Sequence, residues 1–138
     1  MRIAIVGAGR VGSTLGRRWT GSATTSPLAT RGADVVVIAL PWAAVESALV
    51  GLDVGDSVVV DATNPLAANA RELTARPELS GAELIAGWTG SERVTKAFNT
   101  TGAGNMADVA YPSAPSSRPL MPVAGDDAAA KPGRHRPG

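Results

Sequence analysis

Three glycines near the start of the chain have the spacing of a phosphate-binding turn. The apolar run Arg2–Val6 leads into Gly7-Ala8-Gly9-Arg10-Val11-Gly12, which fits the pattern G-x-G-x-x-G. In that pattern the first glycine allows a tight turn, the second lets a pyrophosphate approach the backbone, and the third lets the helix pack closely on the strand. Because a strand precedes this turn and a helix follows it, the sequence predicts half of a dinucleotide site rather than an ordinary glycine turn.

The composition excludes several other chemistries. The chain has 138 residues, no cysteine and one histidine, His135, close to its C-terminal end. Thiol nucleophiles, disulfides and thiolate metal sites are therefore excluded, and we assign no metal site and no proton-transfer residue. Lys and Arg number 13 against 12 Asp and Glu, with no long run of either sign. This balance argues against a nucleic-acid or membrane surface and favours small-molecule partners.

Apolar runs separated by helical patterns predict a parallel α/β sheet of the Rossmann type. Strands are expected at Arg2–Val6, Val35–Leu40 and Ser57–Val60, because continuous apolar runs are typical of strands buried on both faces. Helices are expected between them at Arg10–Trp19 and Ala43–Val50. The three strands should be neighbours, with their C-terminal ends at one edge of the sheet.

The second half of the chain gives weaker patterns. We expect a helix over Leu66–Ala75, a short strand or helix end at Ala82–Ile85, and a strand at Val94–Asn99. Residues 1–130 are expected to form one dinucleotide-binding domain. The segment 131–138 has no apolar periodicity and is expected to be a disordered tail. The absence of cysteine, of a basic leader and of a long apolar segment favours a cytoplasmic protein.

Five segments in this order give the chain a family resemblance. They are Gly7–Gly12, Ala39–Trp42, Asp61–Leu66, Lys96–Gly102 and Val123–Asp127. This set resembles the coenzyme F420-dependent NADP oxidoreductase family, and the likeness extends to about Ala130. Members of that family transfer hydride between NADP(H) and the deazaflavin coenzyme F420. The resemblance therefore implies an oxidoreductase that uses NADP(H) and coenzyme F420.

The resemblance also implies which residues bind the cofactor. The glycine turn would hold the pyrophosphate, and the other segments end strands at the edge where open α/β sheets bind ligands. Packing or turn roles are the alternatives for Trp42, for Asn64-Pro65 and for Phe98. The expected cofactor-binding residues are Gly7, Ala8, Gly9, Arg10, Val11, Gly12, Pro41, Trp42, Thr63, Asn64, Pro65, Ala97, Phe98 and Asn99.

The chain departs from the family pattern in two places. Only Thr20–Asp34 separate the first helix from the strand at Val35–Leu40, so we expect the second and third strands of the first Rossmann half to be missing. A residue at the end of the second strand normally contacts the adenosine ribose. Arg31 and Asp34 precede a strand, so we reject them for this role, while Arg10 is a candidate contact for a 2′-phosphate.

The second departure is at the C-terminal end, where we expect the chain to lack the part that the family uses for dimer formation and deazaflavin binding. Homodimer formation therefore stays open. Pro122 also interrupts the strand expected before Val123–Asp126. Two alternatives to the F420-linked function follow: another NADP-linked reductase, such as a pyrroline-5-carboxylate reductase-like or imine-reducing enzyme, or a non-catalytic, degenerate nucleotide-binding module.

Overall fold

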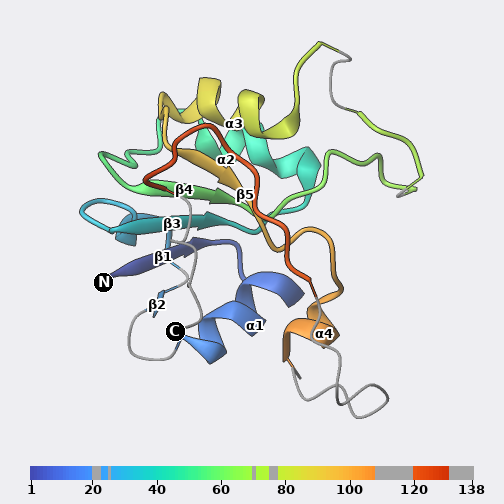
Figure 1. Cartoon of the computed structure of the whole chain (residues 1–138), viewed down its shortest axis with the longest axis horizontal. Coiled ribbons are helices and arrows are strands. Elements are labelled where there is room, and N and C mark those ends of the chain that lie inside the picture. The colour runs from blue at the N-terminus through green and yellow to red at the C-terminus, as the bar shows by residue number, and fades with distance from the viewer. Residues whose placement is uncertain (20–22, 25, 70, 75–77, 108–119, 131–138) are drawn as a thin grey trace, which may run out of the picture.

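A computed structural model describes residues 1–19, 23–24, 26–69, 71–74, 78–107 and 120–130 of the chain. Five parallel strands form one sheet in the order β2-β1-β3-β4-β5 (Figure 1). The strands are β1 (Ile3–Val6), β2 (Ala23–Thr24), β3 (Val35–Ile38), β4 (Val58–Asp61) and β5 (Val94–Lys96). The expected tail, 131–138, lies outside the described residues.

Helices cover both faces of this sheet (Figure 1). On one face lie α2 (Val45–Leu49) and α3 (Gly81–Thr89), and on the other lie α1 (Arg10–Arg18) and α4 (Ala103–Ala107). Short 3-10 turns, η1 (Pro27–Ala29) and η2 (Trp42–Ala44), occupy two of the connections. None of the helices in the described residues is long and apolar enough to cross a bilayer.

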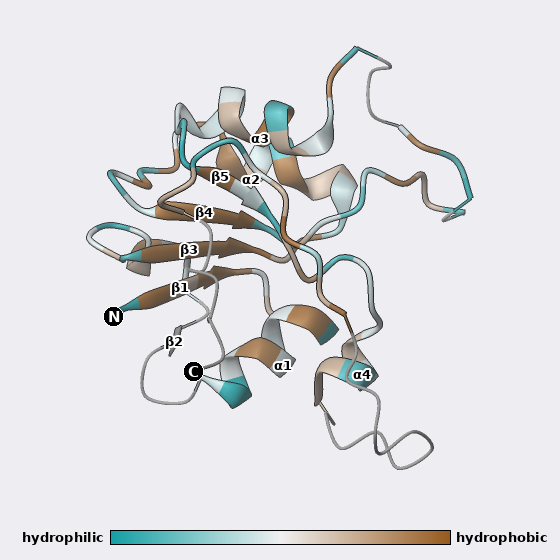
Figure 2. Cartoon of the chain, in the orientation of Figure 1, coloured by the Kyte–Doolittle hydropathy of each residue, from teal (hydrophilic) through white to brown (hydrophobic). Residues whose placement is uncertain are grey.

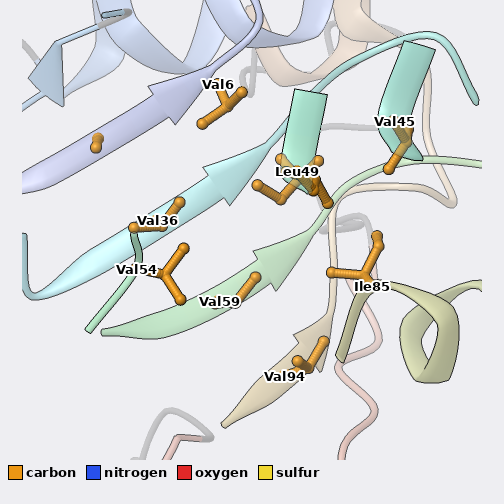
Figure 3. Close-up of a cluster of buried hydrophobic side chains, with 10 residues drawn as sticks. Val6, Val36, Val45, Leu49, Val54, Val59, Ile85 and Val94 are labelled. Atoms are coloured by element: carbon orange, nitrogen blue, oxygen red, sulfur yellow. The ribbon is translucent and has the colours of Figure 1, made fainter. Parts of the chain in front are cut away.

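The strands are apolar on both faces because each face supports its own core (Figure 2). In β3, Val36 and Ile38 join the core under α2 and α3, whereas Val37 joins the core under α1. Figure 3 shows the first of these cores, with Leu49 and Ile85 reaching the sheet from the two helices. The predicted Rossmann-like parallel fold is confirmed.

The register brings the functional segments to one edge. β1 pairs with β3 from Ile3↔Val35 to Val6↔Ile38, and β3 pairs with β4 and β4 with β5 in the same direction. The segments that follow β1, β3, β4 and β5 therefore leave the sheet at its C-terminal edge, as predicted.

The expectation that the second strand is missing is wrong. Ala23 and Thr24 form β2, which pairs in parallel with Ile3 and Ala4. α1 therefore joins β1 to a neighbouring strand, and β1 is not the edge of the sheet. Two residues in a polar stretch carry no alternating pattern, so the sequence gives no sign of this strand. No third strand occurs among residues 26–34, as expected.

The expected helix over Leu66–Ala75 is also wrong. Leu66 and Leu73 form an antiparallel bridge instead. The Ala67 N–H donates to the Glu72 carbonyl, and the Thr74 N–H donates to the Pro65 carbonyl. These N–H groups bond across a turn rather than to residues four earlier in the chain, so no helix forms in the described part of this segment.

Ala82–Ile85, expected as a short strand or helix end, lies inside α3. Ser80 precedes this helix, and its hydroxyl accepts a hydrogen bond from the Glu83 N–H at 3.2 Å. The Glu83 carboxylate accepts one from the Ser80 N–H at 2.7 Å. This capping box fixes the start of the helix, and Gly90, with φ 67°, ends it in the left-handed conformation.

We expect Ser80→Ala to raise the pKa of Glu83 toward its ordinary value. Hydrogen bonds from the Ser80 side chain, and then from its backbone, lower this pKa in the folded protein. A lowered carboxyl pKa stabilises the fold above its ordinary titration range and loses that effect as the pH falls through the lowered value. NMR titration of Glu83 in both proteins measures the shift, and an unchanged pKa would contradict it.

The segment 120–130 lies against the outer edge of β5. Ala124 pairs with Lys96 as an isolated antiparallel bridge, with hydrogen bonds in both directions. The Arg93 Nε donates to the Asp127 carboxylate at 3.0 Å, and this bond lowers the pKa of Asp127. Pairing at one residue only is in keeping with the strand interruption expected at Pro122.

Candidate functional site

The first and third glycines of the glycine loop (Gly7–Gly12) are required by the packing of the fold itself. Gly7 has φ +122°, and a Cβ there would lie 2.3 Å from the carbonyl oxygen of Ala39. A Cβ at Gly12 would lie 1.9 Å from the carbonyl oxygen of Gly7. The loop therefore turns tightly beside the end of β3, and α1 packs directly on it.

Packing inside the protein does not require a glycine at position 9, in contrast to Gly7 and Gly12. A Cβ at this position would meet nothing within 4 Å, and its φ of −70° and ψ of −171° suit any residue. Gly9 precedes α1, whose first intrahelical hydrogen bond runs from the Ser13 N–H to the Gly9 carbonyl at 2.9 Å. The N–H groups of Arg10, Val11 and Gly12 have no helical acceptor. Open space beside free N–H groups is what a pyrophosphate requires.

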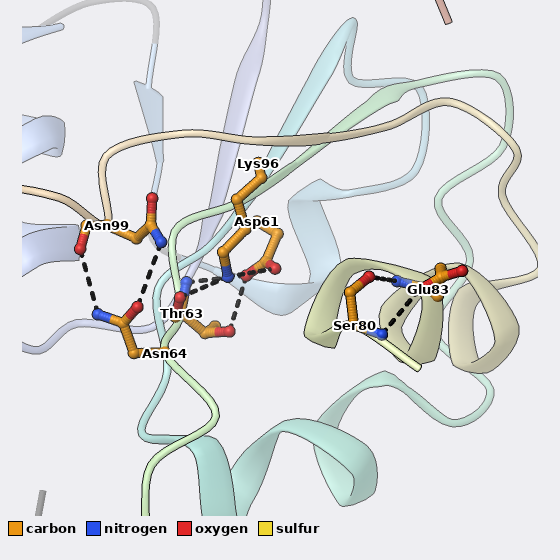
Figure 4. A network of polar contacts seen from close by, with 7 residues as sticks. All are labelled: Asp61, Thr63, Asn64, Ser80, Glu83, Lys96 and Asn99. Atoms are coloured by element: carbon orange, nitrogen blue, oxygen red, sulfur yellow. Dashed lines mark hydrogen bonds and ion pairs between the residues drawn. The ribbon is translucent and has the colours of Figure 1, made fainter. Parts of the chain in front are cut away.

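A buried polar network joins the ends of β4 and β5 (Figure 4). Asp61, fully buried, accepts hydrogen bonds from the Thr63 N–H at 2.8 Å, the Thr63 hydroxyl at 2.7 Å and the Lys96 ammonium at 2.7 Å. The same ammonium donates to the Thr63 carbonyl at 2.6 Å. Thr63, predicted as a cofactor contact, is thus fixed by Asp61 and Lys96, to which the sequence assigned no role in the site.

A second pair joins the loops beyond these strands (Figure 4). The Asn64 Nδ2 donates to the Asn99 carbonyl, and the Asn99 Nδ2 donates to the Asn64 Oδ1, each at 3.2 Å. The structure therefore brings together two predicted site residues that are 35 positions apart. These amides and the buried network add side-chain hydrogen bonds to the backbone pairing between the ends of β4 and β5.

Both asparagines line a large cleft beside α3, the α3 cleft, of about 1010 Å³. Pro65 and Lys96 also line it, so it adjoins the carboxyl ends of β4 and β5. Most of the charged side chains that line this cleft are acidic. The carboxylates that line it are those of Glu78, Glu83, Glu92 and Asp126.

The predicted aromatic contacts have packing roles in the structure. The rings of Trp42 and Trp88 pack with centroids 5.6 Å apart on the α2 and α3 face. Phe98, at φ 62°, packs edge to face on Trp19 at 5.8 Å. Ala97 is buried and Pro41 is exposed at the start of η2. A cofactor contact for these four residues stays a prediction.

The corrected second strand adds a residue that sequence reasoning missed. Ser26 follows β2 closely at the same edge as Gly7, the position from which Rossmann proteins contact the adenosine ribose. The described residues from Ala23 to Thr30 include no acid that would repel a 2′-phosphate. The Asp34 carboxylate accepts a hydrogen bond from the N–H of Arg2, which directly precedes β1. Asp34 therefore lies at the edge of the sheet opposite to the glycine loop, as expected.

Two solved structures share this fold over nearly the whole chain. A hypothetical protein from Sinorhizobium meliloti has a TM-score of 0.77, and a candidate F420-dependent NADP-reductase from Arthrobacter sp. FB24 has a TM-score of 0.70. Each is 22% identical in sequence, and each alignment covers 94% of this chain and 76% of the other. No protein-family model and no curated protein sequence matches the chain. The likeness establishes a Rossmann-like α/β fold.

Proposed function

We propose that this protein is an NADP(H)-linked reductase with coenzyme F420 as its hydride partner. The observation that carries the proposal is the open space at Gly9 beside the free N–H groups of α1. These groups would hold the pyrophosphate, and Asn64 and Asn99 would flank the nicotinamide end of the crevice. The sequence motifs and the name of the Arthrobacter neighbour support the choice of NADP and F420.

The residues at the edge fit a reaction in which the cofactors carry the chemistry. Hydride transfer requires two rings held at near-attack distance rather than a side-chain acid or base. The network of Asp61, Thr63 and Lys96 would hold the two strand ends rigidly around the rings. The polar groups of these side chains are engaged with one another, so their role is to orient the crevice.

Titration with the two reduced dinucleotides, followed by addition of F420, tests the proposal. Ser26 offers a hydroxyl near the ribose, but the described residues from Ala23 to Thr30 include no basic side chain. One hydrogen bond from the Ser26 hydroxyl to the charged 2′-phosphate would contribute about 1.5–3 kcal/mol, so NADPH should bind no more than about a hundredfold more tightly than NADH. Loss of deazaflavin absorbance with NADPH would support the full proposal. Failure to bind either dinucleotide would refute it.

The charge of the α3 cleft favours a second candidate substrate. Four carboxylates and one ammonium line this cleft, and the ammonium is already paired with Asp61. A cationic imine would be attracted to such a wall, whereas an anionic deazaflavin would be repelled. Oxidation of NADPH by a cyclic imine, with no reaction toward F420, would favour an imine reductase. Dinucleotide binding without turnover of either substrate would indicate a non-catalytic binding module.

A further inference from the structure

We infer that a cleft between α1 and α4, the α1–α4 cleft, binds the phosphate group of a small molecule. The cleft has a volume of about 670 Å³ and lies beside the glycine loop, from which Arg10 and Val11 contribute to its wall. Thr14 and Arg17 line it further along α1, and Thr101 and Gly104 line it from the opposite side. The inference adds a phosphate subsite to the proposed function, apart from the pyrophosphate site, and phosphate binding here can be measured without turnover.

The charge of this cleft is opposite to that of the α3 cleft. Arg10 and Arg17 line the α1–α4 cleft, and none of the described residues in its wall is acidic. Arginine keeps its charge at any physiological pH and matches the geometry of phosphate oxygens. The positive end of the α1 dipole, at Arg10, adds to the same field. Anions are therefore attracted to this side of the sheet edge.

The spacing of the two arginines separates this site from the pyrophosphate site. Arg10 and Arg17 are seven positions apart in α1. This spacing corresponds to about 10 Å along the helix axis and places both residues on nearly the same face of the helix. A pyrophosphate at the N–H groups of α1 would reach Arg10, but Arg17 lies two turns further along. The Arg17 Nη2 donates to the Thr14 hydroxyl at 3.4 Å, and both side chains belong to residues that line the cleft. A ligand at Arg17 therefore requires a further anionic group.

Tertiary contacts hold the two walls of the cleft together. The Arg18 Nη1 donates to the Ala107 carbonyl at 2.8 Å, so α1 is bonded to the end of α4. Met106 of α4 is buried in the core beneath α1. A Cβ at Gly104 would meet nothing within 4 Å, so this wall leaves room for a ligand.

Calorimetric titration of the whole chain with inorganic phosphate tests the inference. We expect saturable binding, and a loss of at least about tenfold in affinity in Arg17→Gln, because hydrogen bonds to charged groups contribute about 1.5–3 kcal/mol each. Arg31→Gln is the matched control, since Arg31 is an exposed arginine that pairs with Asp53 at 3.2 Å, away from this cleft. An equal affinity in Arg17→Gln and the unchanged protein would overturn the inference.

A cleft-filling substitution tests the location without changing the charge. Gly104→Leu should weaken phosphate binding by a similar factor. Gly87→Leu should not weaken it, because Gly87 is a helical glycine in α3 with equally open surroundings.

Gly9→Val distinguishes the cleft from the glycine loop. Phosphate binding that survives in this variant would support the cleft, and binding lost with Gly9 would place the ion at the loop and overturn the inference.

Repeating the titration with saturating NADPH identifies the source of the phosphate. Phosphate that still binds would indicate a subsite for a second substrate. Phosphate that is displaced by NADPH but not by NADH, together with weaker NADPH binding in Arg17→Gln, would indicate the 2′-phosphate of the dinucleotide. Both results support phosphate recognition by the cleft, and a protein that binds phosphate but no dinucleotide would refute the proposed function alone.

Discussion

Replacing Gly9 with valine is expected to abolish dinucleotide binding and to leave the fold intact. A Cβ at Gly9 meets no protein atom within 4 Å, so the larger side chain fits the protein but occupies the space proposed for the pyrophosphate. Hydrogen bonds to such a charged group contribute about 1.5–3 kcal/mol each. Loss of two of them would weaken binding by at least about a hundredfold. Titration with NADPH measures the loss.

Two other glycines serve as controls for this result. Gly87→Val also adds a side chain in open surroundings, but in α3, and it should keep full binding. Gly12→Ala should instead lose the folded state, because its Cβ would lie 1.9 Å from the Gly7 carbonyl oxygen. The melting temperature of each variant separates the two effects. Unchanged dinucleotide affinity in folded Gly9→Val protein would disprove the phosphate role of the loop.

The sheet could be predicted because its strands are buried on both faces. A run such as Val35–Ile38 has to be apolar throughout when two helical layers cover it, and the sequence shows this directly. β2 was missed because its two residues pair with β1 through backbone hydrogen bonds, which require no particular side chains. Its position was decided by the tertiary fold.

The start of α3 has a clear signal in the sequence, although a short strand or helix end is what we expected at Ala82–Ile85. Ser80 and Glu83 have the S-x-x-E spacing of a capping box, and Gly90 stands where a left-handed helix end is expected. The bridge between Leu66 and Leu73 had no comparable local signal. Its hydrogen bonds join residues across a turn, so local periodicity carries little information about it.

The candidate site was predicted as a set of strand ends but not as a network. Parallel strands bring their C-terminal ends to one edge, so the convergence of Asn64 and Asn99 follows from fold class alone. The contact of Lys96 with Asp61 depends on the exact register of β4 and β5, in which Asp61 pairs with Lys96. A shift of one residue would turn either side chain to the other face of the sheet.

Lys96→Met is expected to destabilise the protein by about 3–5 kcal/mol, the usual cost of leaving a buried charge without its partner. The Asp61 carboxylate is fully buried, and Lys96 is the cation that pairs with it, at 2.7 Å. Without the ammonium, two hydrogen bonds from Thr63 would remain, and the Thr63 carbonyl would lose a donor. Chemical denaturation of both proteins measures the difference.

A double variant separates the buried charge from the loss of packing. Asp61→Asn removes the negative charge with little change in volume, so adding it to Lys96→Met should restore part of the lost stability. Arg31→Met is the surface control, because its ion pair with Asp53 is exposed on both sides and should contribute less than about 1 kcal/mol. If Lys96→Met proved no more destabilising than Arg31→Met, the pair could not be what holds the ends of β4 and β5. In that case the backbone pairing of β4 with β5 and the reciprocal hydrogen bonds between Asn64 and Asn99 would have to hold the two sides of the crevice.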